Sequence, residues 1–310
     1  MSEWVKIFSP ATVSNVGPGF DVLGFAIDQP GDELTVRKNN TGKFHIVNET
    51  EISLPLDPEK NVASVAVKAM LDALNVQQGF DIVFTRKIYP GSGIGSSAAS
   101  SVGAVFGANE LLGQPFLRKD MVRFAMEGER LACGSAHADN TAPAMMGGFT
   151  LVQSYNPLTI CPIPSPSNLF CTVVHPEIEV KTADARKILK KDITLRAAIT
   201  QWGNLAGLIA GLMQNDFTLI ASSLKDVIVE PVRSILIPKF NDVQKAALDA
   251  GALGCSISGS GPSIFALSNQ QEIADKIAKL MQEIFLSVNI GSKVFVSQVN
   301  PVGVRVMERG

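Results

Sequence analysis

Residues 80–112 read FDIVFTRKIYPGSGIGSSAASSVGAVFGANELL, and this stretch decides the fold. The apolar and β-branched run Phe80–Ile88 predicts a strand, and the alanine-rich run that reaches Leu112 predicts a helix. Between them lies a loop of small residues, Gly91–Ser97. Small residues let backbone N–H groups converge at a helix N-terminus, where an anion binds. The stretch therefore predicts a phosphate-binding loop that opens a helix.

This loop matches neither of the two common phosphate-binding patterns. It lacks the Gly-Lys-Ser/Thr ending of a P-loop, and its glycines do not have the G-x-G-x-x-G spacing. The alternative is structural, because a close helix–strand crossing also needs small residues. A second run, Ser256–Ser263, allows the same two interpretations. Two such loops, in a chain without excess positive charge, suit a phosphate chain held by backbone amides with a metal ion supplying the missing charge.

The order of elements around this stretch indicates the fold class. Strands are predicted in Trp4–Ile27, Glu33–Arg37 and Phe44–Val47, before a helix over Asn61–Leu74. Strands and helices continue in mixed order without a regular repeat, which favours a two-layer α+β architecture over a doubly wound sheet. An uncharged, proline-rich stretch at 156–168 predicts a junction near residue 160. The predicted domains are residues 1–160 and 161–310.

Composition excludes several classes of protein. Of 310 residues, 46% are hydrophobic and 18% charged, so the chain can bury a large core and is not intrinsically disordered. Lys and Arg total 27 against 29 Asp and Glu, and the net charge of -2 predicts no nucleic-acid or membrane partner. Four scattered cysteines disfavour a zinc site or disulfide framework and favour a reducing cytoplasm. No secretory signal or membrane span is predicted.

Two glutamates, Glu127 and Glu129, precede a loop at Gly134 by about one helical turn. A carboxylate with a serine hydroxyl commonly holds Mg²⁺ beside a nucleotide. The alternative for such a pair is a solvated helix face, since charged residues are mostly exposed. His137 leaves a similar choice between a packed or surface histidine and a functional one.

Taken together, the Gly/Ser segments resemble the three motifs of the GHMP small-molecule kinase superfamily, and most closely those of its homoserine kinase branch. The resemblance covers nearly the whole chain. The three motif segments are SPATVSNVGPGFD (residues 9–21), GSGIGSSAAS (residues 91–100) and GSGP (residues 259–262). Residues 135–143, 182–186 and 230–233 are similar to the segments by which that branch holds its amino-acid substrate.

The resemblance implies a two-domain GHMP kinase fold. An N-terminal domain like ribosomal protein S5 domain 2 would bind ATP, and a ferredoxin-like C-terminal domain would contribute to the substrate site. The sequence departs from the family pattern at two positions. Ile94 stands where the family commonly has Leu, and Pro90 comes one residue later than the family's proline. These differences affect how the chain leaves the preceding strand, but they do not affect the backbone N–H groups that would bind the phosphates. A homodimer is also implied.

The implied reaction transfers the γ-phosphoryl group of ATP to the side-chain hydroxyl of L-homoserine, with Mg²⁺ held by Ser97 and Glu129. The expected ATP-binding residues are Pro90, Gly91, Ser92, Gly93, Ile94, Gly95, Ser96, Ser97, Ala98, Ala99, Ser100, Gly259 and Ser260, with Asn61 and Lys87 near the nucleoside. Homoserine is a zwitterion and needs partners of both charges. Asp21 would bind its ammonium group, Arg186 and Arg233 its carboxylate, and Asn15, His137 and Thr182 would orient the rest.

The expected catalytic residues are Asp139, Asn140 and Arg233. Asp139 lies near the place where some superfamily members carry a base, and Asn140 would orient the substrate hydroxyl. Homoserine kinases are thought to work without a positioned base, and a loose transition state needs little help from one, so the role of Asp139 stays open.

Three other interpretations compete with this one. A GHMP kinase for a mevalonate-pathway or sugar substrate would not use Arg186 and Arg233 as a carboxylate clamp. A non-catalytic nucleotide-binding protein would bind ATP without turnover. A dinucleotide-dependent dehydrogenase would require the Rossmann spacing that the loop lacks.

Overall fold

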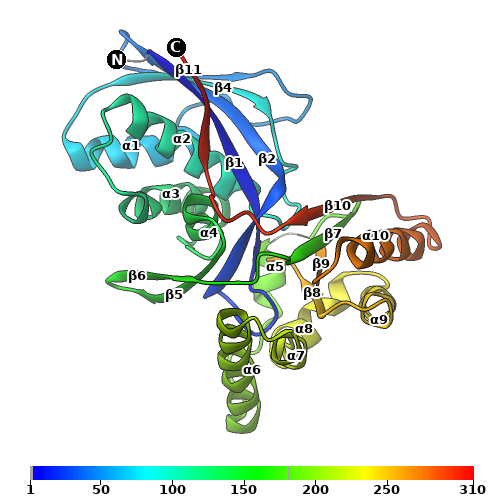
Figure 1. The fold of residues 1–310 in the computed structure, drawn as a ribbon. Coiled ribbons are helices and arrows are strands. Elements are labelled where there is room, and N and C mark those ends of the chain that lie inside the picture. Colours follow the sequence, from blue (N-terminus) through cyan, green and yellow to red (C-terminus); the bar gives the residue numbers. More distant parts are fainter. Residues whose placement is uncertain (1–2, 181) are drawn as a thin grey trace.

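The computed structural model describes residues 3–180 and 182–310, and the side chains of Thr182 and Ala183 lie outside that description. Its larger sheet has seven strands (Figure 1). Five of them follow the order β11-β1-β2-β4-β3, and a hairpin of β5 and β6 attaches to β2. The strands are β1 (Trp4–Ser14), β2 (Leu23–Asn39), β3 (Phe44–Asn48), β4 (Gly79–Arg86), β5 (Phe149–Tyr155), β6 (Leu158–Ile163) and β11 (Arg305–Arg309). β3 and β4 pair in parallel, and the other pairs are antiparallel.

Helices cover one face of this sheet (Figure 1). They are α1 (Val62–Leu74), α2 (Ser96–Leu111), α3 (Arg118–Cys133) and α4 (Thr141–Met146). α2 lies directly on the strands: a Cβ at Gly103 would come 2.6 Å from Leu34, and one at Gly107 would come 2.7 Å from Val36. Its small residues therefore permit a close helix–sheet contact.

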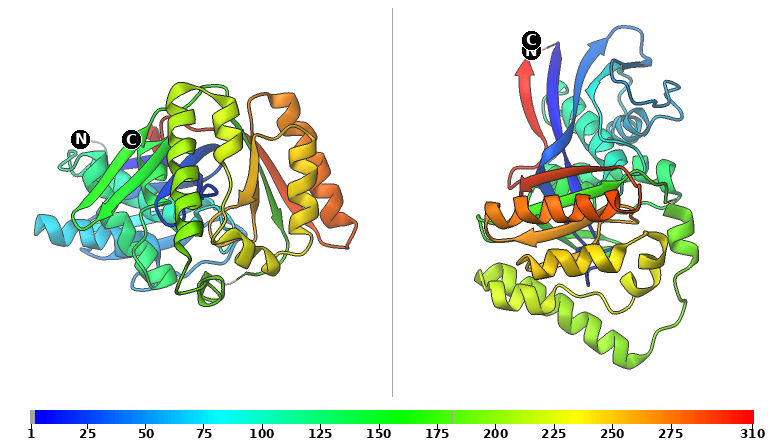
Figure 2. Two further views of the ribbon diagram at one scale, coloured as in Figure 1. Left: turned by 90° about the horizontal axis from the view of Figure 1, so that it is seen from below. Right: turned by 90° about the vertical axis from the view of Figure 1, so that its right-hand side faces the viewer.

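The second sheet has the β-α-β-β-α-β order of a ferredoxin-like fold. Its strands, in the spatial order β10-β7-β9-β8, are β7 (Phe170–Pro176), β8 (Gly254–Ile257), β9 (Ile264–Ser268) and β10 (Ser292–Gln298). The segment between β7 and β8 contains α5 (Thr182–Lys187), α6 (Leu195–Gln214), α7 (Phe217–Ser223), α8 (Glu230–Arg233), the short 3-10 turn η1 (Ser234–Leu236) and α9 (Phe240–Asp249). α10 (Gln271–Leu286) joins β9 to β10, and it packs with α9 on one face of the sheet (Figure 2).

A shared core joins the two sheets. Phe25 of β2 stacks on Phe149 of β5 with ring centroids 4.6 Å apart, and Phe265 of β9 meets Phe25 edge-on at 6.0 Å. Leu208 and Leu212 of α6 belong to the same cluster. This packing fixes the loop that joins β8 to β9 next to the loops of the larger sheet.

The predicted α+β class is confirmed, and the second sheet has the ferredoxin-like topology that the resemblance implies. The predicted junction near residue 160 falls within β6, where Ile160 pairs with Val152 of β5. β6 pairs with β5 alone, and an edge strand tolerates proline. We therefore propose that the boundary lies between Ile163 and Leu169, with β11 returning to the larger sheet.

Two sequence expectations bear on the environment of the chain. Within the described residues, none of the helices combines the length and the apolar character needed to cross a bilayer. All four cysteines are free thiols.

Candidate active site

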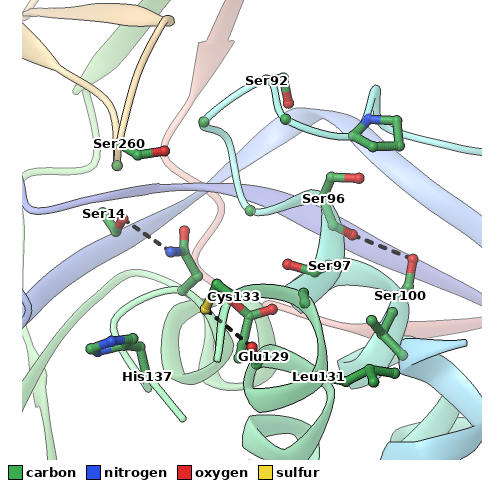
Figure 3. A pocket seen from close by; sticks show the side chains of 18 of the residues that line it. Ser14, Ser92, Ser96, Ser97, Ser100, Glu129, Leu131, Cys133, His137 and Ser260 are labelled. Atoms are coloured by element: carbon green, nitrogen blue, oxygen red, sulfur yellow. Dashed lines mark hydrogen bonds between the residues drawn. The ribbon is translucent and has the colours of Figure 1, made fainter. Parts of the chain in front are cut away.

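A cavity of about 540 Å³ lies where the loops of the two sheets meet (Figure 3). Most of the predicted site residues line it. These are Asn15, Asp21, Asn61, Lys87, Pro90, Gly91, Ser92, Gly93, Gly95, Ser96, Ser97, Ser100, Glu129, His137, Asp139, Asn140, Arg186, Arg233, Gly259 and Ser260. Residues from all six segments quoted for the family resemblance therefore surround one cavity, together with Asn61, Lys87, Pro90 and Glu129.

Three predicted residues of the glycine-rich segment are not part of this lining. Ile94, Ala98 and Ala99 are at most 1% exposed, and their side chains belong to the core. Any contribution they make to anion binding is through the backbone. Thr182 begins α5, but its side chain lies outside the described residues.

The glycine-rich loop has the backbone geometry that an anion site requires. Gly91, Gly93 and Gly95 have φ angles of +73°, +78° and +70°, which only glycine adopts readily. Gly95 precedes α2, and a Cβ there would overlap the Thr12 hydroxyl. The first N–H groups of α2 have no partner within the helix and are available to a bound anion.

The second Gly/Ser run forms the close seam that was one of the two interpretations of its sequence. Ser258 donates its hydroxyl to the Gly93 carbonyl at 2.7 Å, and a Cβ at Gly93 would come 2.7 Å from the Gly261 carbonyl, so the two loops form a close seam. Gly259 and Ser260 nevertheless line the cavity. The run therefore packs against the first loop and also faces the cavity.

Two buried carboxyl groups lie at the base of the cavity. Glu129 is 7% exposed and Asp139 is 4% exposed. Burial raises the pKa of Glu129 to about 7, against the opposing effects of the Ser97 hydroxyl and Lys87. Burial, with the nearby charges of Asp21 and Glu129, raises the pKa of Asp139 to about 7. Each carboxyl group has one buried oxygen with no hydrogen-bond partner in the described part of the chain.

The pair of glutamates on α3 separates into two environments. Glu127 is exposed and pairs with Arg130 at 2.9 Å. Glu129 points inward, close to Ser97 and to the loop that carries Ser92 and Ser96 (Figure 3), and the Ser97 hydroxyl acts to lower the pKa of its carboxyl group. Only one of the two therefore remains a candidate metal ligand.

The donor set fits Mg²⁺. No group of three or more His, Cys, Asp or Glu side chains suited to a metal is present among the described residues. Magnesium bound with a nucleotide commonly takes only one or two protein oxygens, with phosphates and water completing the shell. The unpaired Glu129 oxygen and the adjacent Ser97 hydroxyl are oxygen ligands of that kind.

The charged residues expected to hold the zwitterion form one cluster. Arg186 on α5 donates to the two carboxylate oxygens of Asp21 at 2.9 and 3.1 Å. The same guanidinium lies 2.8 Å from Nε2 of His137, and because arginine only donates, that nitrogen accepts. Burial lowers the pKa of His137, which favours the neutral ring. Its Nδ1 then carries the proton and makes no hydrogen bond among the described residues, although it lies 3.9 Å from Oδ1 of Asp21.

Arg233 approaches this cluster from α8. Its guanidinium donates to the carbonyls of Ala185 and Gly259, each at 3.1 Å. It also lies over the Phe20 ring at 4.9 Å, and Arg186 lies over the same ring at 5.7 Å. The Arg233 side chain is 3% exposed, and burial lowers its pKa while leaving the guanidinium charged.

Three predicted residues have their side chains engaged within the protein. Asn140 accepts from the Thr12 hydroxyl at 2.7 Å and donates to Ser14 at 3.0 Å. Asn61 caps α1 by accepting from the Ala63 N–H at 2.9 Å. Asn15 accepts from the Asp21 N–H at 3.0 Å and donates to the Gly259 carbonyl at 2.7 Å.

Sequence reasoning missed several contributors to the site. Thr12 and Ser14 hold Asn140, and Cys133 lines the cavity beside Glu129. Tyr155 accepts from the Ala138 N–H at 3.3 Å and donates to the Asp21 carbonyl at 2.9 Å. Thr12 and Ser14 could have been predicted from the sequence because they lie inside the first motif segment. Tyr155 lies outside every motif segment, so no feature of the sequence singled it out.

Comparison with known families defines the class. Residues 61–148 match the family described as the GHMP kinases N terminal domain, and residues 208–285 match the GHMP kinases C terminal family. The chain is thus a member of the GHMP kinases, as its fold and its glycine-rich loop indicate. A mevalonate kinase from L. major has a TM-score of 0.73 at 19% identity, covering 96% of each chain, which shows the shared fold alone.

Within this class the chain belongs to the homoserine kinase family. It is 49% identical to a homoserine kinase of Chlorobium phaeobacteroides, over 98% of this chain and 99% of that protein. A homoserine kinase of Xylella fastidiosa is 38% identical over 97% of this chain and 94% of its own length. The crystal structure of a homoserine kinase from Cytophaga hutchinsonii matches with a TM-score of 0.95 at 55% identity, covering 99% of this chain and 98% of that one.

Proposed function

We propose that this protein phosphorylates the side-chain hydroxyl of L-homoserine with ATP, giving O-phospho-L-homoserine for threonine biosynthesis. The observation that carries this is the clustering of Asp21, Arg186 and Arg233 in the same cavity as the glycine-rich loop. A zwitterionic amino acid is bound by side chains of both charges, and a triphosphate is bound by the backbone N–H groups of the loop. Full-length similarity to homoserine kinases supports the same substrate.

The charged cluster supplies the substrate clamp. Homoserine inserts its ammonium group toward Asp21 and its carboxylate toward Arg186 and Arg233. The bond between Asp21 and Arg186, which neutralise each other without substrate, is exchanged for two bonds of the same type. The Nδ1–H of His137 is a further donor for the substrate. This arrangement fixes the direction in which the hydroxyl points.

Catalysis then depends on positioning and charge. The hydroxyl oxygen forms a bond to the γ-phosphorus, and the bond to the bridging oxygen breaks with its electron pair leaving on ADP. The N–H groups of the loop and of the first turn of α2 stabilise the phosphate oxygens. Ser97 and Glu129 would hold Mg²⁺, which neutralises charge on the phosphates when bound.

Asp139 is the candidate acceptor for the hydroxyl proton. Its buried, unpaired oxygen and its pKa of about 7 suit a group that takes a proton near neutrality. The alternative is transfer of the proton to the phosphoryl group itself, with Asn140 orienting the hydroxyl. If Asp139→Asn keeps nearly full turnover while Arg233→Ala loses it, the base-free form is correct; the reverse result identifies Asp139 as the base.

The reaction is tested by measuring ADP release with Mg-ATP and L-homoserine, D-homoserine, mevalonate or galactose, beside a blank without acceptor. Turnover confined to L-homoserine supports the proposal. Turnover with another acceptor alone would assign a different GHMP kinase activity. ATP binding without any turnover would indicate a non-catalytic protein.

We also propose, from the family resemblance, a cytoplasmic homodimer. Light scattering on the purified chain tests the dimer: a monomer mass at micromolar concentration would exclude it. Fractionation of the producing cells tests the location.

A further inference from the structure

A buried ion pair lies beneath the glycine-rich loop. The side chain of Asp32 on β2 is 0% exposed and lies 3.1 Å from Nζ of Lys87, which is 6% exposed. Charged side chains are rarely buried unless they are paired and hydrogen-bonded. Asp32 is not among the expected site residues, and Lys87 was expected only near the nucleoside.

This pair holds both ends of the loop. Asp32 accepts from the N–H of Ile88, where the loop begins, at 2.7 Å and from the hydroxyl of Ser100 in α2 at 2.6 Å. Lys87 donates to the hydroxyl and carbonyl oxygens of Ser96 at 2.6 and 3.0 Å. Ser96 in turn donates to the Ile88 carbonyl at 2.8 Å. Figure 3 shows Ser96 and Ser100 on the first turns of the helix that the loop opens.

The loop does not fix the distance between its ends by itself. Gly91, Gly93 and Gly95 all have positive φ, and glycine has the greatest backbone freedom. Ser258 anchors the middle of the loop through the Gly93 carbonyl at 2.7 Å. Beside the direct bond from Ser96 to the Ile88 carbonyl, the ends therefore depend on the contacts that Asp32 and Lys87 make.

We propose that Asp32 is a positioning residue for phosphate binding. It acts through Lys87 and Ser100 to hold the start of the loop against the first turn of α2, so that the N–H groups of both segments point at the same phosphates. Lys87 then contributes to phosphate binding by holding the loop in position, and not by contacting the nucleoside. This inference rests on the proposed binding of ATP at the loop.

The test is Asp32→Asn in the full chain, which keeps the shape of the side chain but removes its charge. KM for ATP and the inhibition constant of ADP rise about tenfold or more, because charge-assisted hydrogen bonds are lost. KM for L-homoserine and the inhibition constant of adenosine change less than about twofold, because neither ligand carries a phosphate for the loop. The control is Glu33→Gln on the next residue, whose carboxylate pairs with Arg86 at 3.1 Å and Lys6 at 3.5 Å.

A second variant separates positioning from folding. Asp32→Asn leaves the buried Lys87 without a counter-charge, which lowers stability. The double variant Asp32→Asn/Lys87→Met removes both charges. Thermal unfolding returns toward that of the unaltered chain, and KM for ATP stays high because the charged links between the loop ends are lost and only neutral hydrogen bonds, such as that of Ser96 to the Ile88 carbonyl, still join them. An unchanged KM for ATP in the folded double variant overturns the inference, as does an equal rise for adenosine. Failure of the unaltered chain to release ADP with L-homoserine would overturn the proposed function instead.

Discussion

The carboxylate of Asp21 and the guanidinium of Arg186 neutralise each other inside the cavity, with two hydrogen bonds from the same nitrogen at 2.9 and 3.1 Å. Asp21 comes from the loop after β1, and Arg186 comes from α5, 165 residues later. In the ligand-free site, the two side chains that are expected to bind the charged groups of the substrate are therefore paired with each other. A substrate with only one charge would break this bond without replacing both halves of it.

The first prediction concerns that pair. Asp21→Asn raises KM for L-homoserine by about tenfold or more, because the ammonium group loses a charge-assisted hydrogen bond. KM for ATP changes little. The control is Asp184→Asn, since Asp184 is exposed and, within the part of the chain that the structure describes, forms an ion pair with Lys187 of its own helix at 3.4 Å. Steady-state kinetics with each substrate varied in turn measures the effect, and equal KM values in the two variants would contradict it.

The second prediction separates the two glutamates of α3. Glu129→Gln lowers kcat by about a hundredfold or more and raises the Mg²⁺ concentration needed for half-maximal rate, because a neutral amide replaces the anionic ligand. Glu127→Gln, at the exposed position paired with Arg130, stays within about twofold of the unaltered chain. Magnesium titrations of the two variants make the comparison, and matching curves would remove Glu129 from the metal site.

The third prediction concerns pH. The folded chain keeps protons on Glu129 and Asp139 up to about pH 7, whereas their ordinary pKa values are 4.5 and 3.8. Between these limits the native state binds more protons than the unfolded state, so the free energy of unfolding of the ligand-free chain falls as pH rises. The double variant Glu129→Gln/Asp139→Asn loses this contribution. Its unfolding free energy at pH 5 and pH 8 should differ less than that of the unaltered chain; an equal difference would exclude these carboxyls as the cause.

The fourth prediction concerns Tyr155. Its hydroxyl joins the loop of Asp21 to the loop of Ala138, so Tyr155→Phe frees these loops and costs about 1 kcal/mol of stability. We expect KM for L-homoserine to rise roughly three- to tenfold by the same reasoning, with KM for ATP unchanged. Tyr89→Phe, at a position 53% exposed, is the control. Equal kinetics for both variants would show that the Tyr155 hydroxyl does not position the substrate loops.

Local patterns predicted most elements because their causes are local. The apolar stripe of α1, predicted as a helix over Asn61–Leu74, follows from helical periodicity, and α3 shows the same period. That period also separates the glutamates: Glu129 lies four residues after the buried Ala125, on the same face, whereas Glu127 lies on another. The sequence thus held a signal that could have excluded Glu127.

Long-range contacts were beyond this reasoning. Nothing near Asp32 indicates that its partner is Lys87, 55 residues away. The pairing of β1 with β11 joins the two ends of the described chain, and β6 occupies a stretch whose prolines indicated a linker. The roles of the motif residues came from the family resemblance, because Asn15, Asp21 and Arg186 would each pass as a turn or surface residue in isolation.

The position of β11 also affects how this protein is made. β1 lies between β2 and β11, so its outer backbone groups have no strand partner until Arg305–Arg309 has left the ribosome. Translation from β2 to β11 takes roughly 15 to 50 seconds at ordinary elongation rates. During that interval the nascent chain exposes an open strand, so a chaperone that shields strands during synthesis should raise the yield of active protein.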